Sequence, residues 1–158
     1  MDKFLWCLKK KDGIQLVEPN ANLADAYIKK AEDALASMRI NTIQEWKITT
    51  GYYAMYFSLY ALLMKIGIKC EIHSCTIEFA RQLLKVYISK EDIDFLEESM
   101  KARVDTQYYV NKDVPDQYLR NMVKKTPLFV VKCKSLLAQL TEETINKIRE
   151  KISLKSLD

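Results

Sequence analysis

The sequence predicts an all-α protein, an up-and-down bundle of four to five helices. Apolar residues recur at helical spacing over most of the chain, whereas the strict alternation typical of strands is missing. Three glycines and three prolines in 158 residues are too few for a turn-rich β fold. Hydrophobic residues make up 49% and charged residues 29% of the chain, which is typical of a globular protein of one domain.

The first helix is expected to follow an N-terminal arm. Residues 1–18 lack a helical pattern, and residues 14–17 could run extended. We predict the bundle domain over residues 19–153, with Asn22 as a candidate cap of its first helix. The inner face of that helix is predicted from apolar residues at helical spacing: Leu23, Tyr27, Ala31, Leu35 and Met38.

The second helix is predicted to start at Thr42 and to end at Gly67, a residue suited to helix C-termini. It carries no charge from Ile48 to Met64, which raises the question of a membrane span. Four tyrosines and several smaller hydroxyls lie in this stretch, and lipid would leave them without hydrogen-bond partners. We therefore interpret it as the enclosed central helix of the bundle, and we expect no contact with a membrane.

The remaining helices are predicted from capping residues and from helix-compatible prolines. They are expected to start at Ser74, Ser89, Pro115 and Thr141. Pro127 should kink the long helix that contains it, because proline removes one backbone hydrogen bond. Residues 102–111 fit no pattern clearly, and residues 154–158 are predicted to be a C-terminal tail.

The cysteine content and the N-terminal sequence bear on the cellular compartment of the protein. Four cysteines could form two disulfides: Cys7, Cys70, Cys75 and Cys133. A chain of this size and apolar content can bury a core without them, so we expect a fold that does not rely on disulfides. The apolar stretch at residues 4–8 is too short for a signal peptide, and we predict a cytoplasmic protein. The net charge of +4 gives mild attraction to anions.

Four stretches occur in an order and spacing that resemble the HEPN family of small helical domains. They are ADAYIKKAE at 24–32, GYYAMYF at 51–57, LLMKIGI at 62–68 leading to His73 and Ser74, and RVDTQYY at 103–109. The resemblance implies a four- or five-helix bundle that is commonly a homodimer, with the segment around Arg103 facing the dimer cleft. It also implies a minimal nucleotidyltransferase as partner, in a two-component system of the toxin–antitoxin type.

The residues after Arg103 depart from the motif of the HEPN RNases. Those enzymes carry an arginine and, a few residues later, a histidine, because cleavage of RNA without a metal needs a proton-transfer group and a cation. The places for that histidine hold Tyr108, Tyr109 and Val110, and tyrosine, with a pKa of about 10, is a poor base at neutral pH. Along the chain, no imidazole lies within reach of Arg103. We expect no catalytic residues of the usual kind.

Five residues are the candidate nucleotide- or RNA-binding residues: Arg103, Asp105, Tyr108, Tyr109 and His73. In a binding interpretation, the arginine holds a phosphate and a tyrosine ring stacks on a base. In the plainer interpretation, Arg103 pairs with Asp105 or another nearby carboxylate, and the tyrosines line the end of the bundle or a dimer contact. In some relatives, the partner nucleotidyltransferase adenylylates a tyrosine two places after the histidine. That place holds Val110 here, so the modification does not transfer directly, although Tyr108 or Tyr109 could substitute.

Cys70, His73 and Cys75 could suggest a zinc site, but structural zinc needs four ligands and no second ligand pair is evident. We predict buried apolar cysteines and expect neither a metal nor another cofactor. The function we predict is a non-catalytic HEPN-type module that dimerises, binds a nucleotidyltransferase partner and contacts nucleotide or RNA near Arg103. The alternative is a metal-independent, toxin-like RNase that uses Arg103 with a tyrosine or with His73.

Overall fold

The computed structural model describes residues 2–156 and confirms the all-helical fold. It contains more helices than the four to five that the sequence predicts, because seven lie within these residues, together with two very short strands. In chain order the elements are α1 Lys3–Lys9, β1 Gln15–Leu16, α2 Ala21–Ile40, α3 Gln44–Ile66, β2 Ile68–Lys69, α4 His73–Leu83, α5 Lys90–Tyr108, α6 Asp116–Gln139 and α7 Glu142–Lys155.

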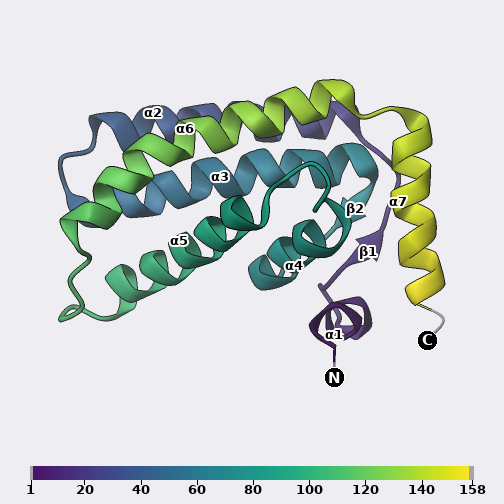
Figure 1. Cartoon of the computed structure of the whole chain (residues 1–158), viewed down its shortest axis with the longest axis horizontal. Helices are drawn as coiled ribbons and strands as arrows, with labels where there is room; N and C mark the ends of the chain where they lie inside the picture. Colours follow the sequence, from purple (N-terminus) through teal and green to yellow (C-terminus); the bar gives the residue numbers. More distant parts are fainter. Residues whose placement is uncertain (1, 157–158) are drawn as a thin grey trace.

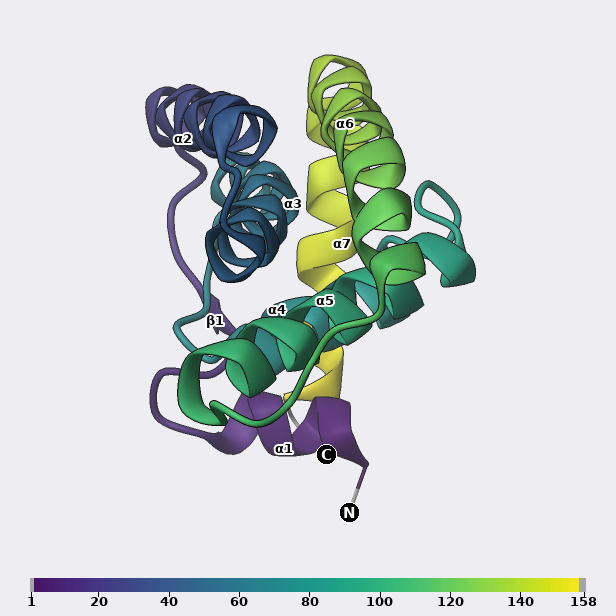
Figure 2. The same cartoon turned by 90° about the vertical axis from the view of Figure 1, so that its left-hand side faces the viewer.

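Helix α3 is the centre of the bundle. It packs against α2, α5 and α6, and in the end-on view α2 and α6 lie on one side of it and α4 and α5 on the other (Figure 2). Helix α7 turns away from α6 and closes one end of the bundle (Figure 1). The uncharged stretch of α3 from Ile48 to Met64 suits this position, because a helix segment that is apolar on nearly all sides is stable only when it is enclosed.

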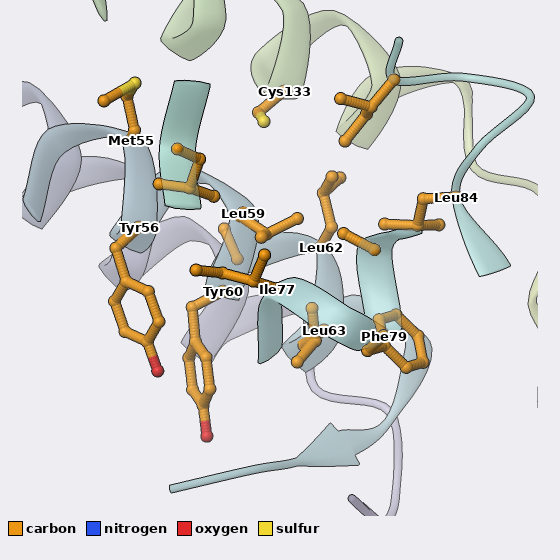
Figure 3. Packing of buried hydrophobic residues seen from close by; sticks show 14 of the residues in the cluster. Met55, Tyr56, Leu59, Tyr60, Leu62, Leu63, Ile77, Phe79, Leu84 and Cys133 are labelled. Carbon is orange, nitrogen blue, oxygen red and sulfur yellow. The ribbon is translucent and has the colours of Figure 1, made fainter. Parts of the chain in front are cut away.

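The core forms where α3 meets α4 and α6. Leu59, Leu62 and Leu63 of α3 interleave with Ile77 and Phe79 of α4, and Cys133 of α6 closes the layer (Figure 3). Tyr56 and Tyr60 leave this layer on the same side of α3, so their hydroxyl groups point away from the leucines (Figure 3). One face of the central helix is therefore aliphatic, and a neighbouring face is aromatic and carries polar tips.

Several predicted helix ends are confirmed. The side chains of Ser89 and Thr141 accept hydrogen bonds from the backbone N–H groups of Asp92 and Thr144, and so cap α5 and α7. Gly67 ends α3 with a left-handed φ of 85°, a conformation that glycine adopts without steric penalty. Arg149 of α7 donates from Nη1 to the carbonyl oxygens of Ile66 and Gly67, which satisfies orphan acceptors at this end.

Other predicted helix ends are wrong. Asn20, rather than Asn22, caps α2, and neither α3 nor α4 has a side-chain cap, so Thr42 and Ser74 do not act as caps. Helix α5 continues to Tyr108, through most of the segment that fitted no pattern. By contrast, Pro127 lies in the interior of α6, inside the long helix as predicted. Helix α7 continues through Lys155, past the predicted start of the tail, and residues 157 and 158 lie outside the described residues.

The N-terminal segment is tied to the bundle by a disulfide, which corrects the expectation of a fold without disulfides. Cys7 of α1 is bonded to Cys75 of α4, with an S–S distance of 2.04 Å, whereas Cys70 and Cys133 are free and buried. Phe4 of α1 is also buried, and β1 pairs with β2 in antiparallel register. Residues 1–18, predicted as an arm, thus include a helix and a strand that are packed onto the fold.

Within the described part of the chain, no helix combines the length and the apolar character needed to cross a membrane.

Candidate functional site

The candidate site is built on the tyrosines of α3. Tyr52, Tyr56 and Tyr60 are four residues apart and therefore share one helix face, on which neighbouring rings stack at centroid distances of 5.8 Å. Tyr53 lies beside this row, with its ring 5.3 Å from that of Tyr52. Tyr52 is fully buried and Tyr53 is only partly buried, so the aromatic layer extends from the core to the surface.

His73 joins this layer as the first residue of α4. Its Nδ1 lies 2.7 Å from the Tyr52 hydroxyl oxygen. The imidazole stacks on the Tyr56 ring at 4.1 Å and stands edge-on to the Tyr53 ring at 6.2 Å. Helix α4 begins where the loop after β2 ends, and this loop turns the chain back along α3, which brings His73 to the tyrosines.

Arg103 reaches the same tyrosines from α5. The centre of its guanidinium lies 5.2 Å from the Tyr52 ring and 5.4 Å from the Tyr53 ring, within the range of cation–π attraction. Its Nη1 donates to the Tyr53 hydroxyl at 3.1 Å and to Gln107 Oε1 at 3.4 Å. Its Nε is buried without a hydrogen-bond partner among the described residues. The structure thus brings Arg103 and His73 to one aromatic pair, a proximity that spacing along the chain does not predict.

The plainer interpretation of Arg103 as the partner of a nearby carboxylate is not observed. Asp105 instead pairs with Lys112, whose Nζ lies 3.1 Å from the carboxylate. No carboxylate in the described residues forms a salt bridge with Arg103. The positive charge of Arg103 is therefore balanced by aromatic rings and neutral oxygens, and it is available to an anion.

Tyr52, Tyr53, His73 and Arg103 form what we call the Arg103 cluster, and Tyr108 and Tyr109 lie apart from it. They are 72% and 50% exposed, at the end of α5, and the Lys112 ammonium lies 4.6 Å from the Tyr109 ring. Tyr109 lines a hollow of about 400 Å³ between the start of α3 and the loop after α5. Gln107 also lines this hollow, so the hollow borders the Arg103 cluster without containing it.

Burial sets the protonation states in the cluster. It raises the pKa of the Tyr52 and Tyr56 hydroxyls far above the usual value, so both stay protonated at neutral pH. Burial, and secondarily the Arg103 charge, lowers the pKa of His73 below its ordinary 6.5, so the imidazole is neutral at pH 7. The guanidinium of Arg103 therefore carries a positive charge beside a neutral Tyr52 and a neutral His73 at that pH.

Sequence reasoning identified Arg103 and His73 as candidates but missed how Tyr52, Tyr53 and Gln107 complete the site. The available signal was the pair of adjacent tyrosines in GYYAMYF, which periodicity alone assigns to bundle packing. The Cys-x-x-His-x-Cys pattern does not form a zinc site, because Cys75 is consumed by the disulfide with Cys7. The described residues contain no cluster of three or more side chains suited to hold a metal ion.

Comparison with known proteins places the chain in a class. The family model for the HEPN domain matches residues 24–136, a range that covers most of the chain and includes α3, His73 and Arg103. The protein therefore belongs to the HEPN family. Among curated proteins, none matches the chain.

Proposed function

We propose that this protein is a non-catalytic HEPN-type binding module whose Arg103 cluster takes the phosphate of a nucleotide or of RNA. The observation that carries this proposal is a partly buried arginine that forms no salt bridge with a carboxylate of residues 2–156 and that is framed by aromatic rings. A guanidinium presents several N–H donors in one plane, which suits phosphate oxygens.

The hydrogen bonds around Arg103 add to this donor character. The Tyr53 hydroxyl accepts from Arg103, so its own proton is free to be donated to a ligand. Gln107 accepts from Arg103 and donates through its amide to Thr49, which holds the arginine from the other side. A site that offers a positive charge and a hydroxyl proton, without a paired carboxylate, favours an oxyanion over a cation or an apolar ligand.

Binding of single-stranded RNA and of nucleotides, measured by fluorescence anisotropy and calorimetry, tests the proposal. For Arg103→Gln we expect a loss of about ten- to a hundredfold in affinity, because hydrogen bonds to charged groups contribute about 1.5–3 kcal/mol. The slope of log affinity against log salt should fall by roughly 0.7, the value for one phosphate contact on a single strand. Arg120→Gln is the matched control, because Arg120 is exposed and its side chain hydrogen-bonds, among the described residues, only to Gln117 of its own helix. Equal affinities of the Arg103→Gln variant and the wild type would refute the site.

The assembly state and the partner rest on the family. HEPN domains are commonly homodimers that work with a minimal nucleotidyltransferase, and we propose the same for this chain, in a toxin–antitoxin-like pair within the cytoplasm. Sedimentation equilibrium tests the dimer. Co-expression with a nucleotidyltransferase encoded beside it tests the partner, and failure of the two to co-purify would count against this part of the proposal.

A second candidate function is a metal-independent RNase. It is favoured by one observation, that His73 lies against the same tyrosines as Arg103. Purified protein should then cleave RNA in the presence of a chelator, and both Arg103→Gln and His73→Gln should abolish cleavage while the far-UV circular dichroism stays unchanged. RNA that stays intact after long incubation with wild-type protein would end this interpretation.

A further inference from the structure

The hydrogen bond between Tyr52 and His73 has a direction that burial decides. Tyr52 is 0% exposed, and among the described residues the only hydrogen-bond partner of its hydroxyl is Nδ1 of His73, at 2.7 Å. One proton lies between these two atoms. Either the phenol donates it to the ring nitrogen, or the ring donates it to the phenol.

The two directions differ in what they leave unsatisfied. If the imidazole donated, the phenolic O–H would be a buried donor without an acceptor, and a buried donor without a partner is costly. If Tyr52 donates, only oxygen lone pairs stay unused, and unused acceptors are tolerated more often than unused donors. Tyr52 is therefore the donor, and Nδ1 of His73 is the acceptor.

A neutral imidazole with an accepting Nδ1 carries its proton on Nε2. The Nε2 atom makes no hydrogen bond within the described residues. The only buried side-chain nitrogen or oxygen atoms without a partner in this part of the chain are Arg103 Nε and Thr126 Oγ1. His73 Nε2 is therefore not completely buried, and its N–H has no acceptor within the described residues.

We infer that Tyr52 fixes His73 as the Nε2–H tautomer, so that His73 presents a hydrogen-bond donor, rather than a base, to the oxygen-rich ligand held by Arg103. Tyr52 is a positioning residue in this account, because it acts through the imidazole. The nature of the ligand rests on the proposed function, which this inference deepens. Arg103, Tyr53 and His73 all offer hydrogen-bond donors from the same aromatic layer. The ligand class that matches them is a nucleotide or RNA segment that meets the cluster with phosphate or sugar oxygens.

The same tautomer makes His73 unsuited to the alternative function. A general base must present an unprotonated nitrogen to the 2′-hydroxyl. In the Nε2–H tautomer, the unprotonated nitrogen is Nδ1, which is occupied by the Tyr52 hydroxyl. His73 can therefore hold a ligand but cannot take its proton without first breaking this hydrogen bond.

Nitrogen-15 correlation spectroscopy of the imidazole, recorded on the full chain without ligand at neutral pH, measures the tautomer directly. The chain has one histidine, so every imidazole signal belongs to His73. We expect a protonated Nε2 and an unprotonated Nδ1 in the wild type. In Tyr52→Phe, which keeps the ring and removes the hydroxyl, the Nδ1–H form should become populated.

Tyr56→Phe is the matched control for this spectrum. Tyr56 stacks on the same imidazole, but its hydroxyl lies 3.3 Å from Thr76 Oγ1 instead of bonding to the ring. Its removal should leave the tautomer unchanged. A protonated Nδ1 in the wild type, or equal tautomer populations in the wild type and Tyr52→Phe, would overturn the inference.

Binding of a single-stranded RNA of about ten nucleotides tests the donor role. His73→Phe keeps a ring against Tyr56 and loses the N–H, so its affinity should fall about two- to tenfold, the effect of one neutral hydrogen bond. Unchanged affinity of His73→Phe, with Arg103→Gln impaired, would overturn the donor role and leave the proposed function standing. If the wild type bound no RNA or nucleotide, the proposed function and the donor role would both fail, whereas the tautomer would still be decided by the spectrum.

Discussion

Reduction of the disulfide between Cys7 and Cys75 should destabilise the protein substantially. The two cysteines are 68 residues apart, so the cross-link closes a long loop in the unfolded chain. In the chain-entropy description, a loop of this length corresponds to about 4 kcal/mol of stability. We therefore expect reductant to lower the free energy of unfolding in urea by about this amount and to lower the urea midpoint. The denaturant slope m should change only because the unfolded chain becomes less compact.

Helix α1 should respond most strongly. It has seven residues, and helices shorter than about 12 residues are marginal in water without tertiary support. Its main attachments are the disulfide and the burial of Phe4, and a buried phenylalanine contributes only about 1.5–3 kcal/mol. Amide hydrogen exchange in α1 should therefore accelerate on reduction before exchange in α3 does.

The variant Cys7→Ala/Cys75→Ala is the control for this experiment. It should unfold like the reduced wild type and should not respond to reductant. Thiol titration of unfolded, unreduced wild-type protein should find the two free cysteines, Cys70 and Cys133. Four reactive thiols, or an unfolding midpoint that reductant leaves unchanged, would refute the reasoning. Because cytosolic thiols are usually kept reduced, the same titration on thiol-trapped cells also tests the predicted cytoplasmic location.

Three further predictions concern stability. Gly67→Ala should cost about 2–4 kcal/mol in urea unfolding, because alanine is strained at a φ of 85° and its Cβ would collide with the Arg149 guanidinium; a cost below about 1 kcal/mol would mean that the helix end relaxes freely. Thr126→Val should raise the free energy of unfolding by about 1 kcal/mol, because the buried Thr126 hydroxyl has no hydrogen-bond partner within the described residues. A loss of stability in the same assay would mean that the hydroxyl does have a partner. Since burial and Arg103 lower the pKa of folded His73, its contribution to stability is complete above about pH 6.5 and is lost as the pH falls through its folded pKa. The free energy of unfolding, measured from pH 7 downward, should therefore fall more steeply with pH in the wild type than in His73→Gln. Equal slopes of the unfolding free energy against pH in the two proteins would contradict the lowered pKa of His73.

Helical periodicity predicted most of the fold because it is a local property. The apolar repeat of α2, the uncharged run of α3 and the caps at Ser89 and Thr141 all depend on residues within a turn or two of each other. The helix α1 was missed because its seven residues carry no full amphipathic repeat, and its stability comes from Phe4 and the disulfide instead.

The candidate site was only partly predictable for a related reason. Arg103 could be identified from the RVDTQYY stretch, and the absence of a histidine after it is a plain property of the sequence. Its partner could not be identified: Asp105 is the nearest carboxylate along the chain, yet it pairs with Lys112, while Arg103 bonds to Tyr53, 50 residues away. Side chains of one helix diverge around its axis, so neighbours in sequence often face different surroundings.

By itself, the sequence determined an all-helical HEPN bundle with a buried central helix, and an arginine that no histidine follows along the chain. Only the tertiary structure decided that His73 and Arg103 meet at the same tyrosines, that Tyr52 occupies one nitrogen of the imidazole, and that Cys7 reaches Cys75. The physical reason is that these contacts join different helices. Periodicity specifies which face of a helix is buried, whereas the way the helices pack determines which residues meet across the buried faces.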